Sequence, residues 1–337
     1  MKVSIIIPVY NVAPYIEDCL RSVMRQTYKG AMECIIVDDC GADDSMAIVE
    51  RMVSLYEGAI CFVILHHTHN RGLSAARNTG TEAAKGDYIY YLDSDDEITD
   101  DCIEKLLAKI SEYPDLEMVQ GNGLTILSKK NVKIQYKKRI NSHATNNDEV
   151  RKCFHQLGHR TLAVWNKLIR RDFIINNNLL CKEGVVSEDI LWSFLLIKYL
   201  NRAYFIDDVT YHYRMRSDSI VVSTPRRIKG ESFTLMYTDI LLNLTAGHEK
   251  WELDYYVKDI GYTYTRYAHR IPKIKKVFEL LVKTGNQYGS RRCRLQIPFY
   301  SLLGKFKYGW SVCFIMRLLM QPQTTFRHIC RYFIVKK

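Results

Sequence analysis

Runs of consecutive apolar residues alternate, over the N-terminal third of the chain, with segments in which apolar residues recur at helical spacing. The apolar runs are typical of buried strands and comprise Val3–Val9, Cys34–Val37, Ile60–Leu65 and Tyr88–Leu92. The periodic segments predict amphipathic helices over Pro14–Arg25, Ser45–Leu55 and Leu73–Ala84. Strands and helices that alternate in units of this size predict an α/β fold with a mostly parallel sheet flanked by helices.

The pattern is less regular beyond residue 100. We expect a helix over residues 101–113, helical segments from Glu149 onward and over residues 228–284, and strands at Met118–Leu127, Val132–Tyr136, Tyr204–Ile206 and Val209–Tyr213. The polar segment Ser142–Asp148 predicts a loop. We therefore divide the chain into a domain over residues 1–225 with halves at 1–100 and 101–225, a helical extension over 226–290 and a basic amphipathic tail over 291–337.

The formal charge of the chain is +11, and it is concentrated toward the C-terminal end. Residues 266–337 contain 16 Lys and Arg residues and a single acid, Glu279. Such a basic segment suits an anionic membrane surface or a nucleic acid. Apolar residues at helical spacing between the charges, among them Trp310, Phe314 and Leu318, favour the membrane, although a terminal helix packed on the domain fits the same pattern.

The ten cysteines have no C-x-x-C pair and no regular spacing, which indicates reduced thiols in a cytoplasmic protein. Several lie inside apolar runs and are expected to be buried, namely Cys34, Cys61 and Cys313. The neighbouring histidines lack a usual zinc spacing and predict a solvated loop that contains His66, His67 and His69. No apolar stretch is long enough for a spanning helix, and the first apolar run predicts a strand rather than a signal peptide, so we expect a peripheral protein on the inner face of the cell membrane.

The apolar run Tyr88–Leu92 leads directly into Asp93-Ser94-Asp95-Asp96. Ionised carboxylates are rarely packed at the end of a buried strand without a cation or a hydrogen-bonding ligand, and ligands of open α/β sheets bind at the carboxyl ends of the strands. Asp93 and Asp95 point the same way along an extended backbone and can hold one Mg²⁺ or Mn²⁺ together with phosphate oxygens. A solvated acidic turn that caps a helix near Asp100 explains the same four residues.

Polar residues also follow the other predicted strands, Tyr10 and Asn11 after the first and Asp38-Asp39 after the second. Parallel strands bring their carboxyl ends to the same edge of a sheet. The third predicted helix follows Gly72, which permits close backbone approach, and it contains Arg77, which can pair with a phosphate. An aromatic ring, carboxylates, free backbone amides and a metal-binding pair at one edge suit a nucleoside diphosphate.

Five motifs in this order resemble those of the family 2 glycosyltransferases, which have the GT-A fold. They are Ser4-Ile5-Ile6-Ile7-Pro8-Val9-Tyr10-Asn11, Ile36-Val37-Asp38-Asp39, Gly72-Leu73-Ser74-Ala75-Ala76-Arg77-Asn78, Tyr91-Leu92-Asp93-Ser94-Asp95-Asp96 and Ser187-Glu188-Asp189-Ile190-Leu191-Trp192. The resemblance covers residues 1–215. It implies a Rossmann-like GT-A catalytic domain of the bacterial polysaccharide-biosynthesis type, with a donor half, an acceptor half and a helical C-terminal extension.

The resemblance implies a donor site for a nucleotide sugar. Tyr10 and Asp39 would hold uracil or another base, and Asp93 would contact the ribose. The remaining predicted donor residues are Pro8, Asn11 and Arg77. Asp95 would bind the divalent cation, Mg²⁺ or Mn²⁺, beneath the diphosphate, and His212 is a further candidate metal ligand that a hydrogen-bonded core histidine explains equally well.

The resemblance also implies that Asp189 is the general base that takes the proton from the acceptor hydroxyl. A helix N-cap or a solvated acid is the alternative for this residue. The candidate acceptor-site residues are Trp165, Lys167 and Glu188; the ring of Trp165 suits stacking on a sugar but is also typical of a core residue. The chain departs from the family at Cys40-Gly41, where members more often carry Gly-Ser, and this exchange could alter the turn after Asp39.

Together these residues predict an inverting, metal-dependent glycosyltransferase that moves a sugar from a UDP-sugar to a glycan or lipid-linked acceptor in cell-surface polysaccharide synthesis. A nucleotidyltransferase would need a Gly-rich, basic loop after the first strand, but Val9–Pro14 contains neither Gly nor Lys. A non-catalytic, membrane-associated nucleotide-sugar-binding module would be expected to lack at least one of the site acids, all of which are present. Binding of nucleic acid by the tail is disfavoured by its apolar residues, so we predict no nucleic-acid partner.

Overall fold

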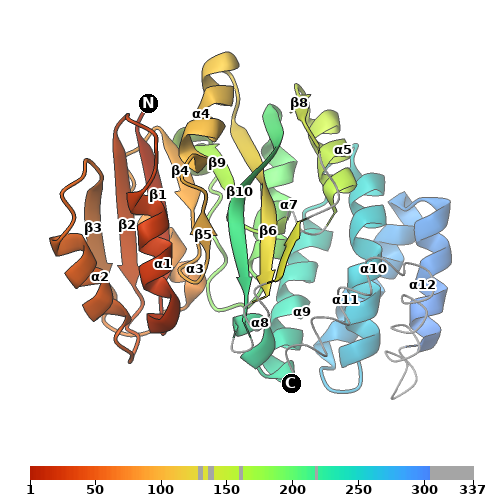
Figure 1. Ribbon diagram of the computed structural model, residues 1–337. Coiled ribbons are helices and arrows are strands. Elements are labelled where there is room, and N and C mark those ends of the chain that lie inside the picture. Colours follow the sequence, from red (N-terminus) through yellow and green to blue (C-terminus); the bar gives the residue numbers. More distant parts are fainter. Residues whose placement is uncertain (128–131, 136–139, 159–161, 217–218, 304–337) are drawn as a thin grey trace. The chain divides into compact units, whose positions relative to one another are not determined.

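The computed structural model describes residues 1–127, 132–135, 140–158, 162–216 and 219–303 (Figure 1). The chain divides into two compact units. The first unit combines Met1–Gly184 with Glu188–Met215 and contains the sheet. The second unit combines Val185–Ser187 with the described residues from Arg216 onward and is helical.

The first unit begins with the alternating strands and helices that the sequence predicts. These are β1 (Val3–Val9), α1 (Ala13–Met24), β2 (Met32–Asp38), α2 (Ser45–Ser54), β3 (Cys61–His66), α3 (Leu73–Ala83) and β4 (Tyr88–Tyr91). β1 pairs in parallel with both β2 and β4. Its side chains alternate between the faces of the sheet, so Ile5 and Ile7 join the core around Leu20, whereas Ile6 faces α3. A Cβ on Gly80 would lie 2.4 Å from Ile6, which explains why α3 carries a glycine there.

The rest of the first unit extends the same sheet. Its elements are β5 (Glu97–Ile98), α4 (Cys102–Glu112), β6 (Met118–Leu127), β7 (Val132–Gln135), β8 (Ser142–Ala144), α5 (Asn147–Leu157), β9 (Lys167–Arg170), α6 (Arg171–Asn176), α7 (Asp189–Tyr199) and β10 (Ala203–Met215). The expected helix over residues 101–113 and the expected strand pair at Met118–Leu127 and Val132–Tyr136 are confirmed, with ends that differ by one residue or less.

Two expectations for this half are wrong, and one strand was not expected. The segment Ser142–Asp148 is not a loop, because β8 pairs with β10 and α5 begins at Asn147. The two strands expected between Tyr204 and Tyr213 are one strand, β10, whose register against β6 shifts at Val209. The strand β9 was not predicted, because its four residues between polar neighbours carry no periodic signal.

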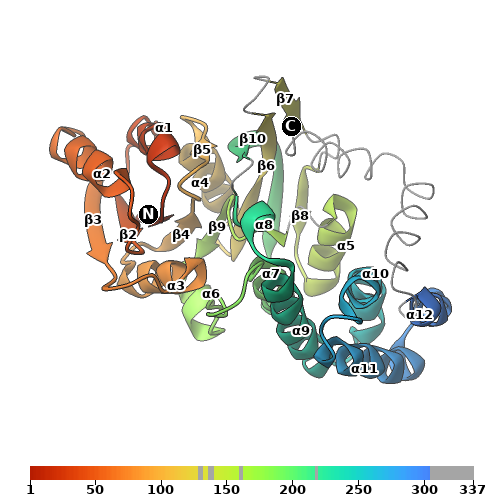
Figure 2. The same ribbon diagram turned by 90° about the horizontal axis from the view of Figure 1, so that it is seen from below.

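The described residues form a ten-stranded sheet with the order β3-β2-β1-β4-β9-β6-β10-β5, while β7 pairs with β6 and β8 with β10. β9 separates the two halves of the sheet, since it lies antiparallel between β4 and β6. Helices α1, α2 and α4 cover one face of the sheet, and α3, α6 and α7 cover the other (Figure 2). The parallel strands β1, β2 and β4 end at one edge, where Asn11, Asp39 and Asp93 follow them.

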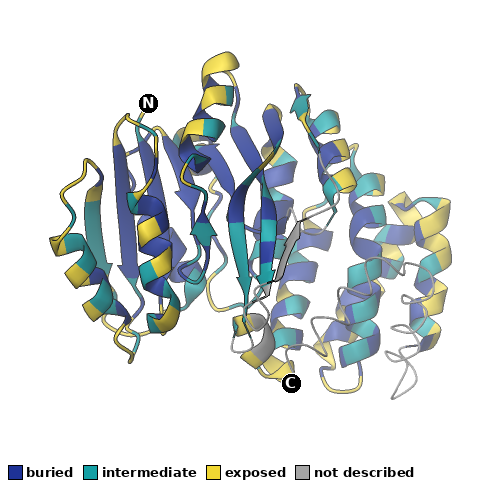
Figure 3. Ribbon diagram, viewed as in Figure 1, coloured by how far each residue is buried: buried dark blue, intermediate teal, exposed yellow. Residues whose placement is uncertain are grey.

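Burial decreases toward the edge of the sheet at β3. β1 and β4 are buried along their whole length, whereas β3 is half-buried with exposed ends (Figure 3). Cys61 is therefore exposed, contrary to expectation, because it begins this edge strand. Cys34 in β2 is buried as expected, and Cys313 lies outside the described residues.

The second unit consists of helices α8 (Ile220–Ser223), α9 (Arg226–Leu242), α10 (Glu249–Tyr267), α11 (Lys273–Tyr288) and α12 (Arg291–Leu303). Glycines allow α12 to pack closely on its neighbours: a Cβ on Gly261 would lie 2.2 Å from Tyr300, and one on Gly285 would lie 2.4 Å from Ile297. Among the helices of the described ranges, none is both long and apolar enough to cross a membrane. The tail residues Trp310, Phe314 and Leu318 lie outside the described ranges.

Candidate active site

The acidic turn Asp93–Asp96 follows β4 at the carboxyl edge of the sheet, and the Asp96 backbone N–H donates to the Asp93 carbonyl oxygen at 3.0 Å. Asp93 and Asp95 are half-buried, whereas Asp96 is only 1% exposed. The turn is thus not a solvated helix cap, because its last acid is buried and α4 begins further on, at Cys102.

Asp96 holds β10 against the acidic turn. Its carboxylate accepts hydrogen bonds from the Tyr211 hydroxyl and from the Arg214 backbone N–H, both at 2.7 Å. Burial, together with the nearby carboxylates of Asp95 and Asp93, raises the pKa of Asp96 well above its usual range. Of the three acids in the turn, Asp96 is therefore structural, whereas Asp93 and Asp95 are half-buried.

Asp39 ties the end of β2 to the loop that opens α3. One carboxylate oxygen accepts from the backbone N–H of Arg71 and the other from that of Gly72, both at 2.8 Å. His67 Nδ1 lies 2.7 Å from Asp39 Oδ1, and His67 Nε2 lies 2.9 Å from the Thr79 hydroxyl. The Asp39 carboxylate is 2% exposed, so its contact with the donor base stays a prediction.

The expectation of a solvated loop for the three histidines is wrong for His67, whose side chain is buried against Asp39. His66 ends β3 and lies 3.0 Å from Asp38, the neighbouring acid on β2. The signal that could have identified both histidines is their place at the end of a strand parallel to β2. Strands that pair in parallel bring residues after them to the same edge.

Tyr10 and Asn11 follow β1, and Pro8 is buried within that strand. The Tyr10 side chain is 45% exposed and thus accessible to a ligand. Cys40 has a φ of +59°, the left-handed conformation that favours glycine, and a Cβ on Gly41 would lie 3.0 Å from Asn11. Cys40 thus adopts the left-handed conformation although it carries a Cβ, and Gly41 allows the close approach to Asn11.

We expect Cys40→Gly to raise the free energy of unfolding by about 1 kcal/mol, because it relieves the left-handed conformation of a residue with a Cβ. Urea denaturation measures the change. Cys61→Gly is the matched control, since it removes an exposed thiol from an extended strand and should destabilise by about 0.5–1 kcal/mol. A Cys40→Gly variant less stable than wild type would show that the thiol makes contacts that outweigh the strain.

Arg77 of α3 lies between the acidic turn and the N-terminus of α7. Its Nη2 donates to Asp93 Oδ1 at 2.6 Å, and its Nη1 donates to Glu188 Oε1. Glu188 is the N-cap residue of α7, and Asp189 is the first residue of that helix. The structure therefore brings Asp93, predicted to contact the ribose, and Asp189, the predicted base, to the same buried arginine.

Asp189 is half-buried and not a solvated acid. Burial and the neighbouring Glu188 carboxylate raise the pKa of Asp189 to about 7, against the opposing charge of Arg77. Burial likewise lowers the pKa of Lys167 to about 7, against the opposing charge of Asp189. A carboxylate with a pKa near neutral pH is suited to general base catalysis. The role of Asp189 in the reaction stays a prediction.

The predicted acceptor residues differ in exposure. The ring of Trp165 is half-buried and stacks on Tyr211 at a centroid distance of 4.3 Å and on Tyr213 at 5.8 Å. Lys167 is 1% exposed and donates from Nζ to the Ala163 carbonyl oxygen. Trp165 thus contributes to an aromatic wall beside the acidic turn, whose contact with an acceptor stays a prediction.

The two predicted metal ligands come from different elements. Asp95 lies in the acidic turn, and His212 on β10 pairs with Glu97 on β5. Within the described part of the chain, no three Asp, Glu, His or Cys side chains converge on a common point. One or two carboxylates plus substrate phosphates are the usual ligands of Mg²⁺, so the half-buried Asp95 fits a cation that is shared with a diphosphate. A cation held by protein side chains alone does not fit these residues.

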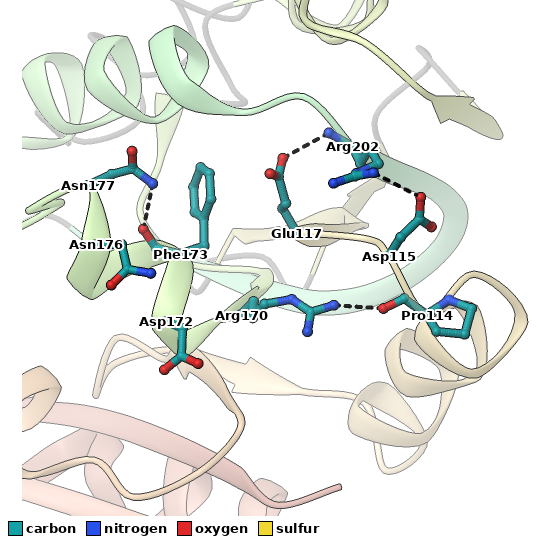
Figure 4. A pocket seen from close by; sticks show the side chains of 9 residues that line it. All are labelled: Pro114, Asp115, Glu117, Arg170, Asp172, Phe173, Asn176, Asn177 and Arg202. Carbon is teal, nitrogen blue, oxygen red and sulfur yellow. Dashed lines mark hydrogen bonds and ion pairs between the residues drawn. The ribbon is translucent and has the colours of Figure 1, made fainter.

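One pocket, with a volume of about 510 Å³, lies at the opposite edge of the sheet (Figure 4). It is lined by Pro114, Asp115, Glu117, Arg170, Asp172, Phe173, Asn176, Asn177 and Arg202. Two charged side chains that line the pocket are hydrogen-bonded to the backbone of the protein. Arg170 donates to the Pro114 carbonyl oxygen at 2.7 Å, and Glu117 accepts from the Arg202 backbone N–H at 2.9 Å. Because ligands of such sheets bind at the carboxyl ends of the strands, we place the active site at the acidic turn.

Comparison with known proteins identifies the family of the chain. The model of glycosyl transferase family 2 matches residues 4–174, which are half of the chain. EpsJ of Bacillus subtilis (strain 168), an uncharacterized glycosyltransferase, is 31% identical over 220 residues, which cover 65% of this chain and 62% of EpsJ. EpsH of the same organism is 30% identical over 267 residues, which cover 77% of this chain and 72% of EpsH. The chain thus spans less than two thirds of the length of EpsJ.

Solved structures show the same fold. S. aureus TarS (residues 1–349) in complex with UDP-GlcNAc matches with a TM-score of 0.71 at 18% identity, over 96% of this chain and 92% of that one. The mannosyltransferase PcManGT from Pyrobaculum calidifontis, in complex with GDP-Man and Mn²⁺, matches with a TM-score of 0.54 at 14% identity, over 94% and 84%. The fold is GT-A with a helical C-terminal region, as the resemblance implies. Since the family model covers the strands and the acidic turn that build the site, the chain belongs to glycosyl transferase family 2.

Proposed function

We propose that the protein is an inverting glycosyltransferase that moves a sugar from a UDP-sugar to a glycan or lipid-linked acceptor in cell-surface polysaccharide synthesis. The observation that carries this proposal is the shared arginine: Arg77 donates to Asp93 at 2.6 Å and also to Glu188, next to Asp189. Groups predicted for the donor and for the acceptor hydroxyl thereby lie on two sides of one buried side chain. The UDP and UDP-GlcNAc bound to TarS support a UDP-linked donor.

The donor would lie across the carboxyl ends of β1, β2 and β4. Tyr10, which is 45% exposed, would stack on the base, and Asp93 would hold the ribose. Asp95 would hold a divalent cation, for which the Mn²⁺ bound to PcManGT is a precedent, with His212 as a second candidate ligand. When bound, the cation would offset the negative charge that develops on the diphosphate.

The reaction that these residues support is a single displacement. The acceptor hydroxyl gives its proton to the Asp189 carboxylate while its oxygen attacks the anomeric carbon of the donor sugar. The bond from that carbon to the diphosphate oxygen breaks, and UDP leaves with the electron pair. Attack from the side opposite to UDP inverts the anomeric centre. Asp189 can accept the proton at neutral pH because its pKa is about 7.

A panel of nucleotide sugars tests the proposal directly. The full chain is incubated with each donor and with lipid-linked and free glycans, and mass spectrometry detects hydrolysed and transferred sugar. A product that requires a UDP-sugar, appears with the inverted linkage and depends on Asp189 supports the proposal. Formation of a nucleotide sugar from a nucleoside triphosphate and a sugar phosphate, with release of pyrophosphate, would instead show a nucleotidyltransferase.

We also propose that the helical unit binds the inner face of an anionic membrane. α12 exposes an apolar stripe of Leu295, Phe299 and Leu302, with exposed fractions of 68%, 38% and 55%. Three exposed arginines lie at the start of the same helix, Arg291, Arg292 and Arg294. Apolar residues beside cations on one helix are typical of binding at a membrane interface. A peripheral location would bring the site to lipid-linked acceptors.

We expect the full chain to sediment with anionic vesicles at low salt and to be released as salt increases, because each Lys or Arg near such a surface contributes about 1 kcal/mol. The triple variant Arg291→Gln, Arg292→Gln, Arg294→Gln should weaken binding by roughly 10²-fold. Co-sedimentation across a salt series is the measurement. Truncation at Tyr288 is a poor test, because it would expose the faces of α10 and α11 that pack on α12.

Two controls separate lipid binding from other causes. Leu295→Gln should weaken vesicle binding, whereas Leu55→Gln, at the 75% exposed leucine that follows α2, should not. Neither the triple arginine variant nor wild type should bind neutral vesicles at moderate salt. Full-length protein that stays in the supernatant with anionic vesicles at low salt would contradict the membrane proposal.

A further inference from the structure

Arg77 is a buried cation with two anionic partners from distant parts of the chain. Its side chain is 3% exposed, and its partners lie 16 residues away at Asp93 and 111 residues away at Glu188. Both terminal nitrogens of the guanidinium are therefore bound to protein carboxylates. Such a side chain is poorly placed to grip a phosphate, which was the role expected of it from the sequence.

A second contact from α3 fixes the same region of the chain. The side chain of Asn78 donates to the Cys181 carbonyl oxygen at 2.9 Å and accepts from the Cys181 backbone N–H at 2.8 Å. Trp192 of α7 donates from its indole nitrogen to the Leu179 carbonyl oxygen at 3.1 Å. Adjacent residues of α3 thus hold the segment before α7 by its backbone, as well as the N-cap of α7 through Glu188.

The charges around Asp189 make the position of Arg77 consequential. Two carboxylates approach Asp189: Glu188 from the helix N-cap and Asp93 from the end of β4. Burial raises the pKa of the nearby Cys181 thiol to about 12, so this thiol carries no negative charge at neutral pH. Two basic groups oppose the carboxylates, Arg77 from α3 and Lys167 from β9, but burial lowers the pKa of Lys167 to about 7. Without Arg77, the half-buried Asp93 and the buried Glu188 would lose their hydrogen-bonded cation, and Asp189 would face an excess of negative charge.

We infer that Arg77 is a positioning residue for the predicted transfer: its guanidinium joins the donor-side Asp93 to Glu188 and so fixes the place and charge state of the base Asp189. This inference rests on the proposed function, because it assigns Asp189 the proton. An arginine is required because its planar fork reaches two carboxylates at once, whereas the single ammonium of a lysine cannot span both with the same geometry.

Opposite shifts of the pH profile test this role. Arg77→Gln removes a positive charge near Asp189, which should raise the pKa of the base. The acid limb of the pH profile, where kcat falls as the base becomes protonated, should then move to a higher pH by about one unit. Glu188→Gln removes a negative charge while its amide oxygen can still accept from Arg77, which should move the acid limb down by a similar amount. The measurement is kcat against pH, with the donor that the nucleotide-sugar panel identifies.

Arg77→Lys separates geometry from charge. We expect it to leave the acid limb near that of wild type but to lower kcat by roughly 10–10²-fold, because it cannot hold both carboxylates. Shifts of Arg77→Gln and Glu188→Gln in the same direction, or no shift in either, would overturn the inference. So would a fall in UDP affinity that equals the fall in kcat for Arg77→Lys, because Arg77 would then be a donor contact.

The design distinguishes this inference from the proposed function. If Arg77→Gln does not fold, as thermal unfolding would reveal, the expected downward shift of Glu188→Gln and the rate of Arg77→Lys decide the question alone. Wild-type protein that transfers no sugar from any donor would refute the proposed function. If wild type is active and neither Arg77→Gln nor Glu188→Gln shifts the acid limb of its pH profile, only the role of Arg77 is refuted.

Discussion

Asp189→Asn should retain the affinity of the protein for UDP while sugar transfer falls by roughly 10²–10⁴-fold, the usual contribution of a general base. The amide has the shape of the carboxylate but cannot take the acceptor proton. Asp189 lies at the first position of α7 and is linked to the donor-side turn through Glu188 and Arg77, so donor binding should be spared. Calorimetry with UDP and a transfer assay on the same preparation measure the two effects.

The pH dependence of the wild-type enzyme provides a second check on Asp189. The base must be ionised to accept a proton, and burial holds its pKa at about 7. The rate of transfer should therefore rise with pH, with half of the maximum reached near pH 7. In Asp189→Asn this acid limb should disappear from the residual activity.

Asp172→Asn is the matched control, because this aspartate of α6 is 78% exposed and lines the pocket at the opposite edge of the sheet. It should transfer sugar at the wild-type rate. Turnover close to wild type in Asp189→Asn would refute the assignment of the base. Equal losses of UDP affinity and transfer would instead place Asp189 in the donor site.

Asp95→Ala should abolish most of the metal-dependent part of UDP binding, a loss of roughly 10²-fold, since a cation bound beneath a diphosphate contributes several kcal/mol. The residue is half-buried in the acidic turn, next to the structural Asp96. Binding without metal should change little, because the base and ribose contacts remain. Calorimetry of UDP with and without Mn²⁺ measures both quantities.

Asp100→Ala controls for the loss of one negative charge near the turn, because the side chain of Asp100 is 56% exposed and pairs with Arg25. It should leave the metal dependence of UDP binding intact. Thermal unfolding of both variants detects any loss of structure. A metal-dependent affinity for UDP that survives Asp95→Ala would refute Asp95 as the metal ligand and direct attention to Asp93 and His212.

The donor half of the fold could be predicted from the sequence because its signals are local. The run Val3–Val9 is apolar except at Ser4 and is buried along its whole length, as a central parallel strand requires. The glycine before α3 and the acids after β4 mark the ends of these elements. Such ends can be predicted because they depend on the types of a few neighbouring residues. The acceptor half was harder, since β9 is four residues long and β10 contains a register shift.

By itself, the sequence determined the order of the first strands and helices, the family, and the residues Asp39, Asp93, Asp95 and Asp189 as candidates for chemistry. Only the tertiary structure decided that Asp96 is structural and that Arg77 binds Asp93 and Glu188 rather than solvent. The reason is that burial and charge pairing arise between segments up to 111 residues apart, and no local pattern of apolar and polar residues records such contacts.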